Sequence, residues 1–290
     1  MNGRLLLLCP GQGGQHAGMF DLARTHAGAR DFLDHCAVPA DAAALFDNRV
    51  AQPAIVAATL AMWLALKDTL PAPALVAGYS IGELTAYGVA GAAPLEDIVR
   101  LAAARATLMD AAAKGEPQGL AAISGVAVDA VRKQVDVAIV TGIDSCIVGG
   151  TRVQLDVLPA IWPTARIQLL PVGIASHTAR MQDAVAPFAR LLEGSLGKPR
   201  CPVVAGIDAT RVTRPDVAVD RLSRQLAETI DWAACMDAML EAGITVALEL
   251  GPGAALARML QARHPHIACR SVSDFHTLDG VSAWVARALA

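Results

Sequence analysis

Short apolar runs alternate with longer amphipathic stretches in the first part of the chain. The compact runs at 4–9 and 74–78 predict buried strands. Apolar residues recur at helical spacing at about 17–36, 41–47, 52–70, 81–90 and 95–113. This alternation of strands and helices favours an α/β fold, with a parallel sheet that is covered on both faces.

The pattern changes after the polar, glycine-containing segment 114–119. Helical patterns at about 128–134 and 152–161 separate short β-like runs. These runs are 120–126, 137–141, 146–150 and 165–171. The order β-α-β-β-α-β is that of a ferredoxin-like α+β module. We therefore predict a small inserted subdomain at 119–172, with 1–118 and 173–290 forming one large α/β domain.

The last third of the chain returns to the α/β pattern. Helical spacing resumes at about 178, and strands are predicted near 203–207 and 246–250. A glycine-rich turn, Gly251-Pro252-Gly253, then leads into a predicted helix at 254–263. These elements complete the large domain.

The pentapeptide Gly78-Tyr79-Ser80-Ile81-Gly82 lies between a predicted strand and a predicted helix. Gly-x-Ser-x-Gly in this setting is typical of a nucleophile elbow, a sharp turn that exposes the serine hydroxyl. The free N–H groups and the dipole of the following helix favour a developing oxyanion. The same residues also occur in ordinary strand-to-helix turns, so a nucleophilic Ser80 is a hypothesis at this point.

A nucleophilic serine needs a base within hydrogen-bond reach. His177 is the candidate that we favour, because it ends the loop 173–177 just before a predicted helix. A single histidine is more often structural or solvated than catalytic. The glycine-rich segment 10–15 matches neither a dinucleotide-binding fingerprint nor a P-loop. It is interpreted as a loop of backbone donors beside Ser80, or as a mere connection.

Arg105 stands out by its position on the predicted helix 95–113. At 100° per residue it falls within the apolar stripe of that helix, whereas Arg100 falls on the opposite side. A guanidinium on a core-facing stripe needs an anionic partner or a cavity. The alternative is an arginine whose stem is buried while its head reaches the surface. The first interpretation predicts a pocket that binds a carboxylate in bidentate fashion.

Composition excludes several classes of function. The chain has 290 residues and a net charge of −3, and it shows no basic patch with interleaved aromatics, so we expect no nucleic-acid partner. Its six cysteines form no CxxC pair and its seven histidines no HExxH motif, so we expect no metal site, no disulfides and a reducing cytoplasm. The apolar segment 53–66 is too short to span a bilayer, so we expect a soluble, cytoplasmic protein.

Several separated motifs together resemble those of the malonyl-CoA:acyl carrier protein transacylases, the acyltransferases of fatty acid and polyketide synthesis. The motifs are Pro10–Gln15, Gln52–Ile55 with Trp63, Gly78–Glu83, Arg105 with Met109, Leu170–Val172, Ser176-His177 and Glu249–Gly253. The resemblance covers most of the chain. It implies an α/β-hydrolase-like core with a ferredoxin-like insert, and it implies no cofactor, because malonyl-CoA is a substrate.

The resemblance also implies roles for individual residues. Ser80 corresponds to the nucleophile and His177 to its general base, while the backbone carbonyl of Gln225 orients that base in place of an aspartate. The backbone N–H groups of Gln12 and Ile81 correspond to the oxyanion hole. Arg105 corresponds to the residue that binds the malonyl carboxylate. The implied partners are malonyl-CoA and an acyl carrier protein, and we expect a monomer or a weak oligomer.

Tyr79 departs from the family pattern, which usually has histidine directly before the nucleophile. In this respect the chain looks most like the transacylase (epsilon) subunit of malonate decarboxylase, whose carrier protein bears a phosphoribosyl-dephospho-CoA group. We therefore expect that system, with fatty acid synthesis as the alternative. A serine esterase or thioesterase, and a non-catalytic scaffold subunit, are the more distant alternatives.

Overall fold

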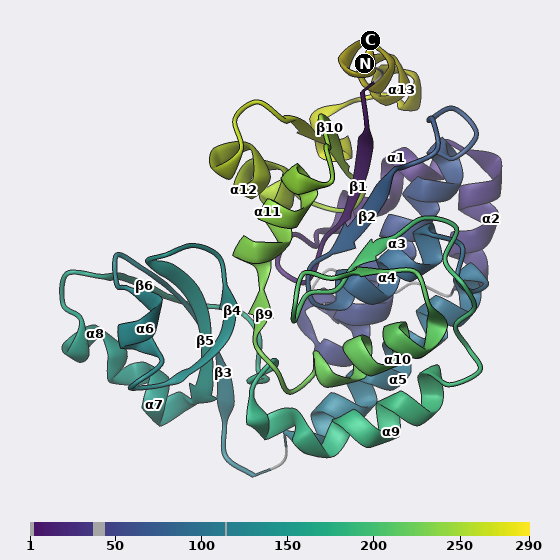
Figure 1. Cartoon of the computed structure of the whole chain (residues 1–290). Helices are drawn as coiled ribbons and strands as arrows, with labels where there is room; N and C mark the ends of the chain where they lie inside the picture. The colour runs from purple at the N-terminus through teal and green to yellow at the C-terminus, as the bar shows by residue number, and fades with distance from the viewer. Residues whose placement is uncertain (1–2, 37–43, 114) are drawn as a thin grey trace.

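The computed structural model describes residues 3–36, 44–113 and 115–290. These residues form two sheets that stand beside each other (Figure 1). The larger sheet has the strand order β11-β10-β1-β2-β7-β8, and only the β7–β8 pair is antiparallel. Its strands are β1 (Leu5–Cys9), β2 (Leu75–Gly78), β7 (Val203–Val204), β8 (Arg211–Val212), β10 (Val246–Glu249) and β11 (Ala268–Ser271).

Both faces of the larger sheet are covered, as the apolar runs predict. Alternate residues of β1 enter two different cores: Leu7 packs with the helices of one face and Leu6 with those of the other. The first face is covered by α3 (Asn48–Leu66), α4 (Ile81–Val89), α5 (Leu95–Ala112), α9 (Gln182–Leu192), α10 (Pro215–Arg224) and α13 (Leu278–Leu289). The second is covered by α11 (Trp232–Glu241) and α12 (Ala255–Arg263).

The smaller sheet has the strand order β6-β3-β5-β4-β9. Its elements are β3 (Gln118–Ser124), α6 (Val128–Val131), β4 (Asp136–Val140), β5 (Ser145–Thr151), α7 (Arg152–Asp156), α8 (Leu158–Ile161), β6 (Arg166–Leu169) and β9 (Ile230–Asp231). The first four strands pair antiparallel and follow the predicted ferredoxin-like order. The fifth, β9, pairs parallel with β4 although it lies outside 119–172. The predicted domain boundaries themselves stay a prediction.

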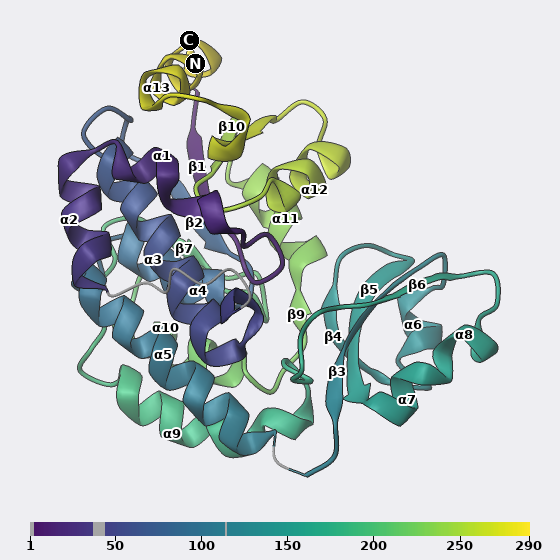
Figure 2. The same cartoon turned by 180° about the vertical axis from the view of Figure 1, so that it is seen from behind.

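The strand β9 therefore joins the two parts of the molecule. In the front and rear views it runs between the large sheet and the small one (Figure 1, Figure 2). Apolar side chains continue across the same junction, because Leu120 and Ile139 of the small sheet belong to the core that contains Leu6 and Leu8. The junction is thus a packed hydrophobic core as well as a covalent connection.

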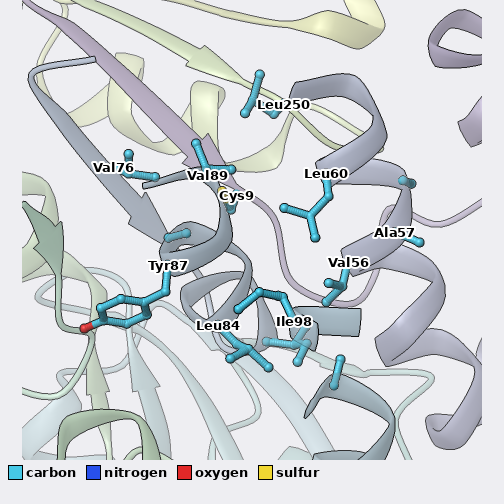
Figure 3. Packing of buried hydrophobic residues seen from close by; sticks show 14 of the residues in the cluster. Cys9, Val56, Ala57, Leu60, Val76, Leu84, Tyr87, Val89, Ile98 and Leu250 are labelled. Atoms are coloured by element: carbon cyan, nitrogen blue, oxygen red, sulfur yellow. The ribbon is translucent and has the colours of Figure 1, made fainter. Parts of the chain in front are cut away.

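The helix α3 runs through the core of the large domain. Its residues Val56 and Leu60 pack towards Leu84 and Val89 of α4 and Ile98 of α5 (Figure 3). By length and composition α3 could cross a membrane, but 72% of its most apolar window is buried inside the fold. Such burial is that of a core helix.

Several predicted boundaries were wrong near the N-terminus. The stretch 17–36 is not one helix but three short ones, η1 (Ala17–Phe20), α1 (Asp21–Arg24) and α2 (Ala27–His35). The break between α1 and α2 occurs because His26 is extended and caps α2. The helix predicted from 52 begins at Asn48, since the Asp47 side chain accepts from the N–H of Arg49. Of the helix predicted at 41–47, residues 41–43 lie outside the described residues, and η2 (Ala44–Phe46) follows.

Two short 3-10 helices complete the fold, η3 (Ala179–Met181) and η4 (Val272–Asp274). The first follows the loop that carries His177 and leads directly into α9. The second follows β11 and begins with a capping box formed by Ser271 and Asp274. The 3-10 helix η3 thus fixes the end of the loop that carries His177.

Candidate active site

Ser80 occupies a sharp turn between β2 and α4. Its backbone angles, φ 55° and ψ −117°, are unfavourable for a residue with a side chain. A Cβ atom on Gly78 would lie 2.0 Å from the carbonyl oxygen of Gly82, and one on Gly82 would lie 2.1 Å from that of Cys9. Only glycine fits at either position, so the close packing of β1, β2 and α4 produces the elbow.

His177 lies directly beside the Ser80 hydroxyl. The distance from Ser80 Oγ to His177 Nε2 is 2.8 Å, and His177 Nδ1 lies 2.6 Å from the backbone oxygen of Gln225. Because a carbonyl oxygen only accepts, Nδ1 carries the proton and Nε2 is left to accept from the serine. The backbone N–H of His177 also donates to Leu226 O at 2.8 Å. The structure thus brings together Ser80, His177 and Gln225 as the motifs predict.

The imidazole of His177 is neutral at ordinary pH. Burial and the nearby Arg105 cation lower the pKa of His177 to about 3, although the bond to Gln225 opposes this shift. His177 is 1% exposed, so water does not compensate a charge there. A neutral imidazole with a free Nε2 is the form that accepts a proton from an attacking serine.

Arg105 lies on the buried face of α5, which confirms the prediction from helical periodicity. The side chain is 2% exposed, whereas Arg100 on the same helix is exposed and pairs with Asp97. The Arg105 guanidinium donates to Gln52 Oε1 at 2.7 Å and to Gln225 Oε1 at 3.4 Å. Burial lowers the pKa of Arg105 to about 10, so the cation persists at neutral pH.

A cavity of about 340 Å³ opens at Ser80. One wall is the loop 10–14 with Tyr79 and His177, and another is apolar and comes from the small sheet, with Leu120, Ile139 and Ile147. Arg105 does not line this cavity, but its charge acts on His177, which does. The cavity thus combines polar groups around Ser80 with an apolar wall from the small sheet.

The glycine-rich loop packs against the elbow. A Cβ atom on Gly11 would lie 2.7 Å from the Tyr79 carbonyl oxygen, and one on Gly14 would lie 2.5 Å from that of Pro252. The Gln15 side chain holds the loop by accepting from the N–H of Gly13 at 2.6 Å. Gln12 thereby lines the cavity beside Ser80, and Ile81 is the first residue of α4. Both backbone positions are those expected of oxyanion donors, a role that stays a prediction.

The sequence reasoning gave no role to two buried carboxyl groups near the site. Glu83 is fully buried, and its Oε2 accepts from the N–H of Gly206 at 2.9 Å and from the side-chain amide of Gln225. Glu249 lines the cavity and accepts from the N–H of Ala257 at 2.9 Å. Burial raises the pKa of each carboxyl group to about 7.

A sequence signal for Glu83 existed. It is the only charged residue of α4, all nine residues of which are buried. A charge in so apolar a helix requires partners from elsewhere in the fold. Gln52 likewise lies on an apolar helix and is fully buried.

The described residues offer no evident metal site. No group of three or more His, Cys, Asp or Glu side chains able to hold an ion occurs in 3–36, 44–113 and 115–290.

Comparisons with known proteins place this geometry in a family. The model of the acyl transferase domain matches residues 6–275. The malonyl CoA-acyl carrier protein transacylase of Mycobacterium tuberculosis is 30% identical over 301 residues, which cover 95% of this chain and 98% of that protein. The crystal structure of a Mycobacterium tuberculosis transacylase superposes with a TM-score of 0.89 at 29% identity, over 96% of this chain and 99% of the other.

A third similar protein was solved with its partner. It is a malonyl-transacylase in complex with a type II polyketide synthase acyl carrier protein, and it has a TM-score of 0.86 and 25% identity. The alignment covers 99% of this chain and 99% of that one. The chain therefore belongs to the acyl transferase domain family and is an acyltransferase of the malonyl-CoA:acyl carrier protein transacylase family.

Proposed function

We propose that the protein transfers a malonyl group from malonyl-CoA to the prosthetic-group thiol of an acyl carrier protein, through a malonyl-Ser80 intermediate. The observation that carries this proposal is the hydrogen-bonded series Ser80 Oγ, His177 Nε2, His177 Nδ1 and the Gln225 carbonyl. The names of the similar transacylases, and the carrier protein bound to one of them, support the choice of donor and acceptor. We also propose a cytoplasmic location, where both would be available.

The first half-reaction loads the enzyme. His177 Nε2 takes the hydroxyl proton of Ser80 as Oγ attacks the thioester carbonyl carbon. The N–H groups of Gln12 and Ile81 stabilise the tetrahedral oxyanion. The carbon–sulfur bond then breaks, and the proton on His177 passes to the departing CoA sulfur. The products are malonyl-Ser80 and CoA with a free thiol.

The second half-reaction repeats these steps with the carrier. His177 accepts the proton of the carrier thiol, whose sulfur attacks the ester carbonyl of malonyl-Ser80. The collapse of the second tetrahedral intermediate returns the proton to Ser80 Oγ. Each half-reaction begins with a neutral His177 whose Nε2 is free to accept a proton, and the Gln225 carbonyl maintains this form by accepting from Nδ1.

The selection of a carboxylated acyl group falls to Arg105. Arg105 bonds to the side chain of Gln225, whose backbone oxygen bonds to His177, and His177 in turn bonds to Ser80. This series of contacts supports the proposal that Arg105 can reach the carboxylate of a malonyl group attached to Ser80. A guanidinium binds a carboxylate through two parallel hydrogen bonds. We propose that the malonyl carboxylate displaces or shares the bond from Arg105 to Gln225, which at 3.4 Å is the longer of its two.

Two rival functions use the same fold. A serine hydrolase would use the same elbow but gives no reason for a buried Arg105, and rapid release of free malonate without any carrier thiol would favour it. A scaffold subunit would need none of the three residues Ser80, His177 and Arg105. Carrier binding without transfer by the purified protein would favour that alternative.

Replacement of Ser80 tests the covalent intermediate. Because Ser80→Ala removes the hydroxyl oxygen that lies 2.8 Å from His177 Nε2, the variant should not gain the malonyl mass when it is mixed with malonyl-CoA. Intact-protein mass spectrometry measures this directly, with the unmodified enzyme as the control. Labelling of Ser80→Ala at the rate of the unmodified enzyme would contradict the mechanism.

Replacement of Arg105 tests the choice of substrate. A charge-assisted bidentate pair contributes about 1.5–3 kcal/mol, so Arg105→Ala should lower malonyl transfer by roughly ten- to a hundredfold while acetyl transfer is unchanged or improved. Arg105→Lys should recover part of the loss. The matched control is Arg100→Ala on the exposed face of α5, which should be nearly silent. Equal losses for malonyl-CoA and acetyl-CoA would show that Arg105 is only structural.

The physiological carrier is a finer question, on which Tyr79 is the guide. Its ring lines the cavity and packs edge-on against Trp232, with ring centroids 5.2 Å apart. Because Tyr79 stands where the family usually has histidine, we propose that the protein acts in the malonate decarboxylase system rather than in fatty acid synthesis.

Malonyl-enzyme should therefore prefer a carrier with the phosphoribosyl-dephospho-CoA group to one with phosphopantetheine. Transfer rates to the two carriers measure this preference. The informative variant is Tyr79→His, which should reduce the difference between the two transfer rates. Equal or faster transfer to the phosphopantetheine carrier would overturn the decarboxylase assignment and leave the transacylase chemistry intact.

A further inference from the structure

Gln225 contacts the site through both its backbone and its side chain. Its backbone oxygen accepts from His177 Nδ1 at 2.6 Å, while its side-chain amide lies between two buried, oppositely charged groups. The amide nitrogen donates to Glu83 Oε2, and the amide oxygen accepts from Arg105 at 3.4 Å. Gln225 itself is 1% exposed. One buried residue thus touches the base, the cation and the acid.

Arg105 and Glu83 are linked by this amide and do not pair directly. Within the described ranges of the chain, Arg105 forms no ion pair with a carboxylate, and its partners are the amides of Gln52 and Gln225. The Gln225 amide presents its oxygen to the cation and its N–H to the anion, so its dipole stabilises both charges. A direct ion pair would occupy the donor edge of the guanidinium. The bridge balances the charge of Arg105 and leaves donors for an incoming carboxylate.

The surroundings of Glu83 disfavour the ionised form of its carboxyl group. Its Oε1 is buried and has no hydrogen-bond partner in the part of the chain that the structure describes, and the same is true of the Tyr87 hydroxyl. An ionised carboxylate with one oxygen left without a donor is costly to bury. Burial therefore raises the pKa of Glu83 to about 7, against the hydrogen bonds from Gly206 and Gln225 and the attraction of Arg105.

The groups around Glu83 come from four other places in the fold. Asp208, in the turn between β7 and β8, raises the pKa of Glu83, and Arg105 on α5 lowers it. Tyr87 on α4 and Cys235 on α11 stay neutral, because burial raises the pKa of both groups. Arg221 on α10 acts on Tyr87 and pairs with Asp208. Among these groups, Arg105 is the cation whose charge lowers the pKa of Glu83, in addition to the hydrogen bonds from Gly206 and Gln225.

We propose that ionised Glu83 balances the charge of Arg105 in the empty enzyme through the Gln225 amide that bridges the two side chains. When a substrate carboxylate binds Arg105, Glu83 takes up a proton. The inference rests on the proposed role of Arg105. In the empty site Arg105 and ionised Glu83 balance. In the loaded site the substrate carboxylate balances Arg105, and Glu83 gains one proton from solvent without any other bond being made or broken. Glu83 is a positioning residue, because it touches neither substrate nor reacting atoms.

Linkage makes this coupling reciprocal. If binding of the malonyl carboxylate raises the pKa of Glu83, protonation of Glu83 strengthens malonyl binding by the same factor. The affinity for malonyl-CoA should therefore be highest below the pKa of Glu83 in the empty enzyme and should fall as the pH rises through about 7. Acetyl-CoA has no carboxylate but carries the same CoA phosphates, so its affinity measures every other pH effect. His177 stays neutral over this range because its pKa is about 3.

The test is the binding of malonyl-CoA to Ser80→Ala enzyme, which removes the chemical step. Calorimetry in buffers of different ionisation enthalpy gives both the dissociation constant and the number of protons taken up. From about pH 6 to about pH 8, malonyl-CoA should bind roughly five- to tenfold more weakly, with net proton uptake approaching one. Acetyl-CoA should show neither effect.

Two glutamine variants in the Ser80→Ala background show which carboxyl group takes up the proton. Glu83→Gln keeps an oxygen that accepts from Gly206 and Gln225 but cannot ionise, so it should abolish both the pH dependence and the proton uptake. Glu249→Gln is the matched control, because Glu249 is also a buried carboxyl group whose pKa is raised to about 7, and it lines the cavity. It should leave both effects in place. If Glu83→Gln does not fold, proton uptake that persists in Glu249→Gln still supports the proposal.

The outcomes separate this inference from the function on which it rests. Absence of proton uptake with malonyl-CoA, its persistence in Glu83→Gln or its loss in Glu249→Gln would overturn the role of Glu83. If Arg105→Ala discriminates between malonyl-CoA and acetyl-CoA, such a result leaves the proposed function standing. If Arg105→Ala weakens both donors equally, the proposed function fails, and the inference fails with it.

Discussion

The candidate active site depends on the burial of one arginine in an apolar core. A guanidinium that is 2% exposed must be balanced within the protein. The charge of Arg105 is balanced by the side-chain amides of Gln52 and Gln225 and by Glu83, which is linked to Arg105 through the Gln225 amide. The main-chain carbonyl of one of those amide residues, Gln225, also accepts from Nδ1 of His177. The orientation of the imidazole and the electrostatics of the cation therefore depend on the same residue.

The two-sheet architecture makes this arrangement possible. The elbow needs β1, β2 and α4 to approach so closely that only glycine fits at positions 78 and 82. Gln225 comes from the end of α10, directly before β9, the strand that joins the large sheet region to the small sheet. His177 comes from the loop that returns from the small sheet. The cavity thus forms where the two sheets meet, with a polar floor from the large domain and an apolar wall from the small sheet.

Much of this could be predicted from sequence because the signals were local. The elbow and the core-facing position of Arg105 depend on residues within one or two adjacent elements, and the β-α-β-β-α-β order is a succession of elements that each show their own local period. The position of Gln225 was different: it came from a family resemblance, since nothing in its local sequence marks a backbone carbonyl that bonds to a histidine 48 residues away. The bridge from Glu83 to Arg105 was missed for the same reason.

Short elements were also beyond sequence reasoning. The strands β8 and β9 have two residues each, too few to show a period, and β9 exists only because β4 offers it an edge. The break between α1 and α2 depends on a cap at His26 that interrupts continuous helical spacing. The strand β9 was decided by a tertiary pairing and the helix break by a local side-chain cap, and neither leaves a periodic signal in the sequence.

The most direct test of the whole account is a crystal structure of the enzyme with malonyl-Ser80 in place. We expect the malonyl carboxylate to lie within hydrogen-bond distance of the Arg105 guanidinium, while the Gln225 carbonyl still accepts from His177 Nδ1. A malonyl group whose carboxylate points along the apolar wall towards Leu120 or out to solvent, with Arg105 still bound only to Gln52 and Gln225, would contradict it.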